Sequence, residues 1–364
     1  MSSPNVANDN NLLAAVATIS ASNAWAVGTS TNASNVTQTL IEHWDGHAWT
    51  IVSSPSPSGS ANSQLTAVAA SSPTDVWAVG SYYPSSSSYS QTLILHYNGT
   101  AWSVVPSPDR TSTNNALEGV VITGSAAWAV GYTTVDIAQS AQTLAEEWNG
   151  TSWSIVSTPN PTIKNGLRGV TATSAGTVWA VGYQVNASGV TETLIEQWSG
   201  TAWTVAPSPN TINAAASSLV AVMSVSDSDV WAVGSSVYTT YPGAHDLPLI
   251  EQWNGSSWII VSGQPVPNNF ADLLGVTGAP GMPIVAVGED VYRANAWDQS
   301  TALTEMWTST QNSWINMAPS PGAFSNLLYG VSADGQRDVF AVGVAWSNST
   351  SSQTLIDQYV PAMC

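Results

Sequence analysis

The chain has 364 residues, of which 8% are charged and 43% hydrophobic, and Asp and Glu outnumber Lys and Arg by 23 to 5. The net charge of −18 argues against nucleic acid and anionic membranes as partners, because both are bound through clustered cations. A chain with 18 Trp is not a disordered one. No apolar run reaches the ~18 residues of a membrane helix, so we expect no membrane insertion.

The two ends of the chain contain few residues that indicate a targeting signal or a chemical site. Met1 to Asn10 contains neither a cation nor an apolar stretch, so no signal peptide is recognised there. The single cysteine, Cys364, is the last residue, which excludes an internal disulfide and a cysteine-based metal site. We expect no cofactor and no metal. The Lys-poor composition, rich in Ser, Thr and Asn, favours an exported bacterial protein, extracellular or at the cell surface.

A Trp-Ala-Val-Gly motif recurs along the whole chain at intervals of about 52 residues. In its last two copies the Trp is replaced by Val285 and Phe340. The glycines of the motif are Gly28, Gly80, Gly131, Gly182, Gly234, Gly288 and Gly343.

Each repeat contains short apolar segments that read as strands. In the second repeat they span 65–70, 75–81, 91–97 and 101–105. The third segment alternates apolar and polar residues, which is typical of a strand. Asn98-Gly99 separates the third from the fourth, and Asn-Gly is the strongest signal of a tight hairpin.

These repeats predict an all-β fold, a seven-bladed β-propeller of four-stranded antiparallel blades. We expect one domain over residues 1–364 and a monomer. Blade seven has no fourth segment after Tyr359, and Ser3-Pro4-Asn5 matches the Ser208-Pro209-Asn210 that follows a fourth strand. Either blade seven is three-stranded, with segment 353–359 as an unpaired edge, or the ring is cut from a longer gene product.

The order Leu-x-x-Val, aromatic-x-Val-Gly, aromatic, Trp resembles the kelch repeat of the galactose-oxidase-type propeller. The resemblance extends over the whole chain and implies the order of the strands within a blade. It implies no copper site, because that site needs a tyrosine crosslinked to an internal cysteine.

Segments 235–248, 289–302 and 344–352 are longer than their counterparts in the other repeats, and we predict that they are loops on one face. Aromatic side chains mixed with charged ones suit sugar rings. A protein interface, or packing within the loops themselves, is the alternative. The candidate binding residues are Tyr238, Tyr241, His245, Asp246, Asp290, Tyr292, Arg293, Trp297, Asp298 and Trp346.

The first strand of each repeat has one variable position, and the first strand of a propeller blade borders the central channel. Glu118, Arg168 and Tyr329 are its chemically distinct members. Glu118 and Arg168 form either a structural ion pair or a contact to a channel ligand. The full series is Ala14, Thr66, Glu118, Arg168, Val220, Leu274 and Tyr329.

An acidic residue recurs in the third segment, at a position that shares a face with core residues. Five scattered cations cannot neutralise all the copies, so we expect buried carboxyl groups that accept hydrogen bonds from neutral donors. Their role is then structural. The series is Glu42, Glu146, Glu196, Glu251, Glu305 and Asp357, with Leu95 in the second repeat.

The leading functional interpretation is a non-enzymatic propeller that binds a glycan or a protein. A carbohydrate-active enzyme is the first alternative, in which loop carboxylates supply an acid and a base. A purely structural repeat scaffold is the second alternative. The carboxylates of the enzyme alternative are Asp246, Glu289, Asp290 and Asp298.

Overall fold

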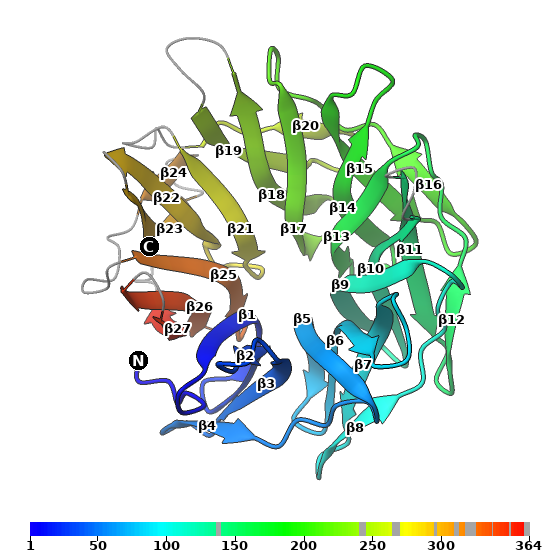
Figure 1. Ribbon diagram of the computed structural model, residues 1–364. Coiled ribbons are helices and arrows are strands. Elements are labelled where there is room, and N and C mark those ends of the chain that lie inside the picture. The colour runs from blue at the N-terminus through cyan, green and yellow to red at the C-terminus, as the bar shows by residue number, and fades with distance from the viewer. Residues whose placement is uncertain are drawn as a thin grey trace.

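The computed structural model describes residues 1–135, 140–239, 245–263, 270–294, 297–308, 313–316, 325–336, 338–348 and 351–359. Its 27 strands form seven blades in a ring around a central axis (Figure 1). The predicted all-β propeller is confirmed. No helix in the described structure is long and apolar enough to span a membrane.

Blades one to four follow each other in chain order. Blade one contains β1 (Asn10–Ser20), β2 (Asn23–Thr31), β3 (Thr37–Trp44) and β4 (Trp49–Val52). Blade two contains β5 (Ser60–Ser72), β6 (Asp75–Pro84), β7 (Gln91–Tyr97) and β8 (Trp102–Val105). Blade three contains β9 (Asn114–Thr123), β10 (Ala126–Val135), β11 (Ser140–Trp148) and β12 (Trp153–Val156). Blade four contains β13 (Asn165–Ala172), β14 (Val178–Val185), β15 (Thr191–Trp198) and β16 (Trp203–Ala206).

Blades five to seven complete the ring, and blade seven has three strands, as predicted. Blade five contains β17 (Ala216–Ser226), β18 (Asp229–Tyr238), β19 (His245–Trp253) and β20 (Trp258–Ile260). Blade six contains β21 (Ala271–Thr277), β22 (Ile284–Ala294), β23 (Trp297–Thr308) and β24 (Ser313–Asn316). Blade seven contains β25 (Ser325–Ala333), β26 (Val339–Asn348) and β27 (Ser351–Tyr359).

Within each blade consecutive strands pair in antiparallel fashion, and the first strand is innermost (Figure 1). A single parallel bridge between Thr191 and Ala216 joins the sheets of blades four and five. The second and third strands are apolar on both faces of the blade. Both faces therefore have to be covered by neighbouring blades.

Tryptophans fill the spaces between blades. Trp128 of blade three lies 4.8 Å from Trp198 and 5.2 Å from Trp203 of blade four, measured between ring centroids. The second contact is edge-to-face at 87°, a favourable geometry for aromatic pairs. The second-strand Trp thus inserts between the third and fourth strands of the next blade.

A Ser-Pro-Asn segment connects blade four to blade five and forms hydrogen bonds with both. Ser208 Oγ lies 2.6 Å from Thr193 Oγ1, and Asn210 Oδ1 accepts a 3.0 Å hydrogen bond from the Thr193 N–H. Ser208 also donates to Glu251 of blade five at 3.0 Å. One short segment therefore bonds to the third strands of two adjacent blades.

Serine-to-glutamate contacts recur at two other places in the ring. The repeated glutamates are completely buried, and the donors to Glu42, Glu146 and Glu251 are neutral hydroxyl groups, as the sequence predicts. Ser107 donates to Glu146 at 2.8 Å, and Ser3 donates to Glu42 at 2.9 Å. The fully buried members described are Glu42, Glu146, Glu196, Glu251 and Glu305.

The amino-terminal segment closes the ring with the same set of bonds. Ser3 Oγ lies 2.6 Å from Thr354 Oγ1 of β27. Asn5 Oδ1 accepts a 2.8 Å bond from the Thr354 N–H. Residues 3–5 thus occupy the place of the connector that follows a fourth strand, although blade seven has no fourth strand in the described structure.

The expectation that the whole of 353–359 forms an unpaired edge is wrong. Asn10 Oδ1 accepts a 3.1 Å bond from the Ser352 N–H, and the Met1 ammonium donates to the Ile356 carbonyl at 2.7 Å. Alternate residues of a strand direct their backbone groups to the same side. The next outward-facing residue is Gln358, and no described strand pairs with it there.

Burial raises the pKa of the interblade carboxyl groups, because desolvation disfavours their charged form. The pKa of Glu42 rises to about 7. Those of Glu146, Glu196 and Glu251 rise to about 8. These groups are therefore largely protonated in the folded protein at pH values where the unfolded chain has released its protons.

The free energy of unfolding should fall as pH rises from about 4.5 to about 8, because the folded state holds more protons in this window. Glu251→Gln, neutral at every pH, should flatten the dependence by up to about 1.4 kcal/mol per pH unit. Urea unfolding at pH 5, 6, 7 and 8 measures both slopes. A stability that rises with pH, or an unchanged slope in the variant, would contradict this account.

Candidate functional site: the central channel

A β-bulge in every first strand directs one side chain into the channel. In blade four, Leu167 pairs with Gly182 and Gly169 pairs with Val181, so Arg168 has no partner in β14. A bulge re-aims the side chain of the extra residue. The bulged residues are the variable series predicted from the sequence: Ala14, Thr66, Glu118, Arg168, Val220, Leu274 and Tyr329.

The glycine of the Trp-Ala-Val-Gly motif makes room for this bulge. A Cβ at Gly182 would lie 1.9 Å from the carbonyl oxygen of Gly166. The corresponding glycines of the other blades would meet a backbone oxygen at 1.8 to 2.0 Å. No side chain fits at such a distance, so the repeated motif and the channel-facing residue are two parts of one backbone geometry.

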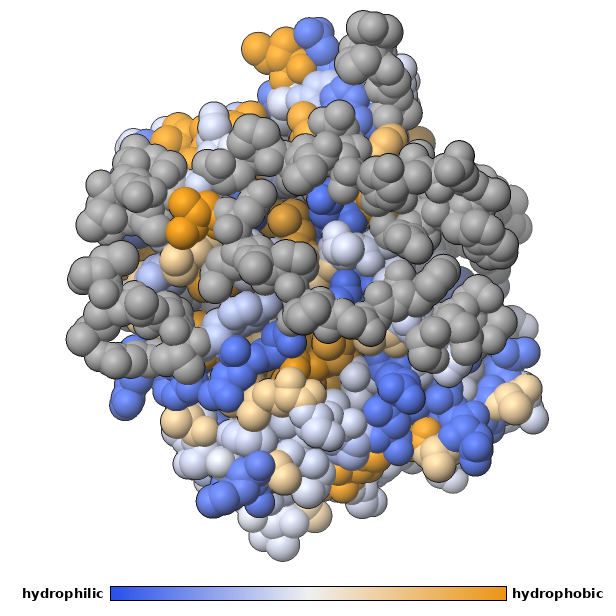
Figure 2. All heavy atoms as spheres, turned by 90° about the vertical axis from the view of Figure 1, so that its left-hand side faces the viewer, coloured by the Kyte–Doolittle hydropathy of each residue, from blue (hydrophilic) through white to orange (hydrophobic). Residues whose placement is uncertain are grey.

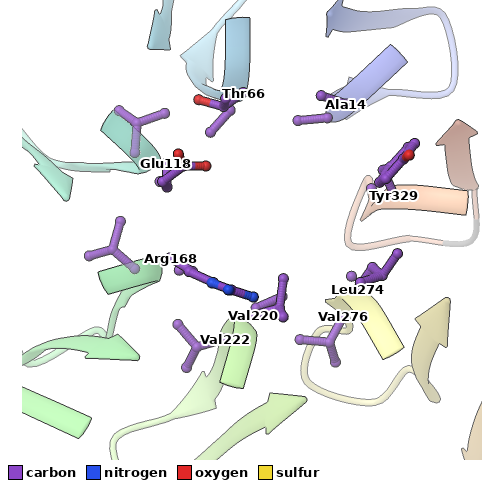
Figure 3. Close-up of a pocket in the computed structure, with 18 of the residues that line it drawn as sticks. Ala14, Thr66, Glu118, Arg168, Val220, Val222, Leu274, Val276 and Tyr329 are labelled. Atoms are coloured by element: carbon purple, nitrogen blue, oxygen red, sulfur yellow. The ribbon is translucent and has the colours of Figure 1, made fainter. Parts of the chain in front are cut away.

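The bulged residues line a cavity of about 590 Å³ on the ring axis. Figure 3 shows Glu118 and Arg168 projecting into it from adjacent blades. Val220 and Leu274 give the following blades an apolar wall, and Tyr329 lies across the channel from Glu118 (Figure 3). The channel is therefore polar on the side of blades three and four.

Two tyrosines complete the polar side. Tyr132 and Tyr183 line the cavity and are half-buried. The guanidinium carbon of Arg168 lies 5.3 Å from the ring centroid of Tyr183, within cation–π distance. Sequence reasoning missed both tyrosines. Each tyrosine directly follows the motif glycine, and the two blades concerned are those that carry Glu118 and Arg168. This shared position is the sequence signal that could have placed both tyrosines at the channel.

The predicted ion pair between Glu118 and Arg168 is not formed. No carboxylate oxygen of the described residues lies within 4.0 Å of an Arg168 nitrogen. Arg168 is exposed to the channel, and burial raises the pKa of Glu118 to about 6, with the charge of Arg168 acting in the opposite direction. The channel thus holds an accessible cation beside a carboxyl group that titrates near neutrality.

The segments expected to be long loops are largely strand. β22 and β23 pair as far as Ala294 and Trp297, and β26 and β27 as far as Asn348 and Ser351. Aromatic and β-branched residues favour such pairing. These hairpins therefore continue past the residues that pair with the first strand of the blade. In the lower half of Figure 2, which shows the left-hand side of Figure 1, the described surface is hydrophilic to neutral, with apolar residues in small separate areas.

The structure places only some of the predicted loop-face residues. The rings of Tyr238 and His245 stack across the β18–β19 hairpin at 4.9 Å, and Asp246 lies opposite Val237 in the same hairpin. Asp290 is buried and Trp346 is half-buried. Tyr241 lies outside the described residues. The side chains of four others are also not described: Tyr292, Arg293, Trp297 and Asp298. Their ligand-binding role stays a prediction.

In the part of the chain that the structure describes, no group of three or more His, Cys, Asp or Glu side chains could hold a metal ion. Among the described residues, Glu118 is the only acidic one that lines the cavity. Acid–base chemistry in the channel would therefore involve one carboxyl group, one guanidinium and three phenols.

No protein-family model and no curated protein matches the sequence. Among solved structures, the fold is similar to an ulvan lyase of a new polysaccharide lyase family, with 8% identity, a TM-score of 0.60, and coverage of 97% of this chain and 94% of that one. The same lyase bound to -[GlcA(1-4)Rha3S]- gives a TM-score of 0.57 at 8% identity, with the same coverage.

A Hadza microbial sialidase is also similar, with 9% identity, a TM-score of 0.53, and coverage of 88% of this chain and 73% of that one. Identities this low show a shared fold alone. The fold is thus that of propeller-like proteins, whereas membership of the kelch family stays a prediction.

Gly182→Ala should lower the free energy of unfolding by about 3 kcal/mol or more, because the new methyl group meets a backbone oxygen that cannot move aside. The matched control is Gly263→Ala, whose Cβ would be 3.5 Å from its nearest neighbour and should leave stability near that of the wild type. Thermal and urea unfolding measure both. Equal stability of the two variants would contradict the proposed link between motif and bulge.

Proposed function

We propose that this protein binds an acidic saccharide in the central channel, with Arg168 as the group that recognises the anion. The observation that carries the proposal is the exposed Arg168, which has no ion-pair or hydrogen-bond partner among the described residues. The net charge of the chain is −18. A carboxylate or sulfate group of a ligand would supply the ion-pair partner that Arg168 lacks among the described residues.

The surroundings of Arg168 suit a sugar ring. Tyr183 and Tyr132 offer aromatic faces and phenolic hydroxyl groups on the polar side of the cavity. The volume of about 590 Å³ lies within the usual range for small-ligand sites. The similarity to carbohydrate-active propellers supports a glycan ligand, and the exported location predicted from composition belongs to the same proposal.

Arg168→Gln should weaken binding of an oligogalacturonate by about 2 kcal/mol, or roughly 30-fold, because the ligand carboxylate loses its cation. Titration calorimetry at low salt measures this, and the wild-type affinity should fall as salt screens the pair. Trp346→Ala is the control for a site on the extended hairpins. Loss of binding in the Trp346 variant, with Arg168→Gln unchanged, would place the site there instead.

A lyase is the second candidate, and the pKa of about 6 for Glu118 favours it. If Arg168 holds a uronate carboxylate, Glu118 can accept the proton on the adjacent carbon. A C=C double bond then forms as the glycosidic C–O bond breaks, and a phenol of the cavity such as that of Tyr132 can donate the proton that the departing oxygen needs. A glycosidase with two carboxylates is less well supported, because the described lining of the cavity contains one acidic residue, Glu118.

Lyase activity should rise with pH through about 6, since only the carboxylate form of Glu118 can accept a proton. Glu118→Gln should abolish cleavage while retaining binding. The absorbance of the unsaturated product, formed from oligogalacturonate or from a sulfated uronate polysaccharide, measures the reaction. Binding without any such product would assign the channel to recognition alone.

A further inference from the structure

A ring of valines lines the cavity two residues after the bulged positions. In blade four Val170 follows Arg168, and in blade five Val222 follows Val220. Figure 3 shows Val222 and Val276 among the residues that line the cavity. The whole set, all of which line the cavity, forms the valine ring: Val16, Val68, Val120, Val170, Val222, Val276 and Val331.

The valine ring is fixed in place by the packing between blades. Val170 belongs to the apolar cluster that contains Trp203, and it is 9% exposed. The residue before it is a glycine, because the first strands of blades four and five lie close together. A Cβ at Gly169 would be 2.9 Å from the carbonyl oxygen of Val220. The valines therefore stay at the channel wall.

The polar groups of the cavity lie on the other side of the bulged positions. Tyr183 pairs with Gly166, two residues before Arg168 in β13. Tyr132 holds the same place in blade three. The first strand of each blade starts at a connector, so the tyrosines lie toward the connectors and the valine ring lies toward the turns that lead to the second strands. The cavity thus has one polar end and one apolar end.

The apolar end opposes the passage of a sugar chain. The hydroxyl groups of a saccharide exchange water for protein partners when they are buried, and each group left without a partner costs free energy. The side chains of the valine ring contain no donor or acceptor. A saccharide bound at Arg168 therefore finds hydrogen-bonding side chains toward the connectors and none at the valine ring.

Lys164 provides a second cation on the connector side of the cavity. Its carbonyl accepts a 2.8 Å bond from the Val185 N–H, so the β pairing reaches this residue. Alternate residues of a strand share a face, which places Lys164 on the face of Gly166, where a Cβ would lie 2.8 Å from the ring of Tyr183. In the described structure its ammonium group has neither an ion pair nor a hydrogen bond. Four residues of extended chain separate it from Arg168 by roughly 13 Å.

We propose that the channel binds the terminal sugar of an acidic polysaccharide, with the sugar's carboxylate on Arg168 and the rest of the chain leaving past Tyr183 toward Lys164. This inference rests on the proposed function and adds which part of the saccharide is bound. The valine ring ends the site on one side, and Lys164 offers a cation to an acidic sugar farther along the chain.

The first test counts protein molecules per saccharide chain by titration calorimetry at low salt. The two ligands are a galacturonate hexamer and a polygalacturonate of defined chain length that is many times longer. Binding of the chain end predicts one protein per chain at both lengths. Binding along the chain predicts several proteins on each polygalacturonate.

The second test measures the affinity of Lys164→Gln for a galacturonate dimer and for the hexamer. Loss of this cation should weaken hexamer binding about fivefold, the effect of one exposed ion pair, and should leave dimer binding unchanged. Arg110→Gln is the matched control. It removes a cation from the connector before blade three, whose guanidinium donates to Gln142, and should change neither affinity.

The outcomes separate this inference from the function on which it rests. Several proteins per polygalacturonate chain would overturn binding of the chain end and leave the saccharide proposal standing. Equal weakening of dimer and hexamer binding by Lys164→Gln, or equal effects of the two variants, would exclude the path past Lys164. Failure of the wild-type protein to bind any of the three galacturonates would contradict the proposed function itself, and with it this inference.

Discussion

The structure depends on the contact between a bulge in each first strand and the glycine opposite it. The bulge turns one residue per blade into the channel, and only glycine leaves room for the carbonyl that the bulge displaces, at 1.9 Å from where a Cβ would stand on Gly182. The seven channel-facing residues can then vary, because the surrounding backbone is fixed by the motif. Glu118 and Arg168 are the charged residues at these variable positions.

The described contacts between blades depend on neutral hydrogen bonds and not on ion pairs. The interblade glutamates are buried, and Glu42, Glu146 and Glu251 accept hydrogen bonds from serine hydroxyl groups. Burial raises the pKa of Glu251 to about 8, so the connector at Ser208 joins two blades without an ion pair. Arg168 forms no ion pair with a described carboxylate and is accessible in the channel.

The repeat predicted the blades, the strand order, the three-stranded seventh blade and the buried acids, because each follows from a periodic pattern. The channel series was also predicted, but the bulge was not, since a bulge depends on pairing register. Tyr132 and Tyr183 were missed because they read as ordinary strand residues. The match of Ser3-Pro4-Asn5 to a connector was predicted, but the hydrogen bonds of Met1 and Asn5 to β27 were not, because they join residues about 350 positions apart.

The most direct test of the account compares one ligand in two chemical forms. An oligogalacturonate and its carboxyl-reduced, neutral counterpart have the same ring sizes and linkages, so they differ only in the group assigned to Arg168. Calorimetry at low salt should show binding of the acidic form and at least roughly 30-fold weaker binding of the neutral form. Equal affinity for the two forms would contradict the central claim that this channel recognises an anion.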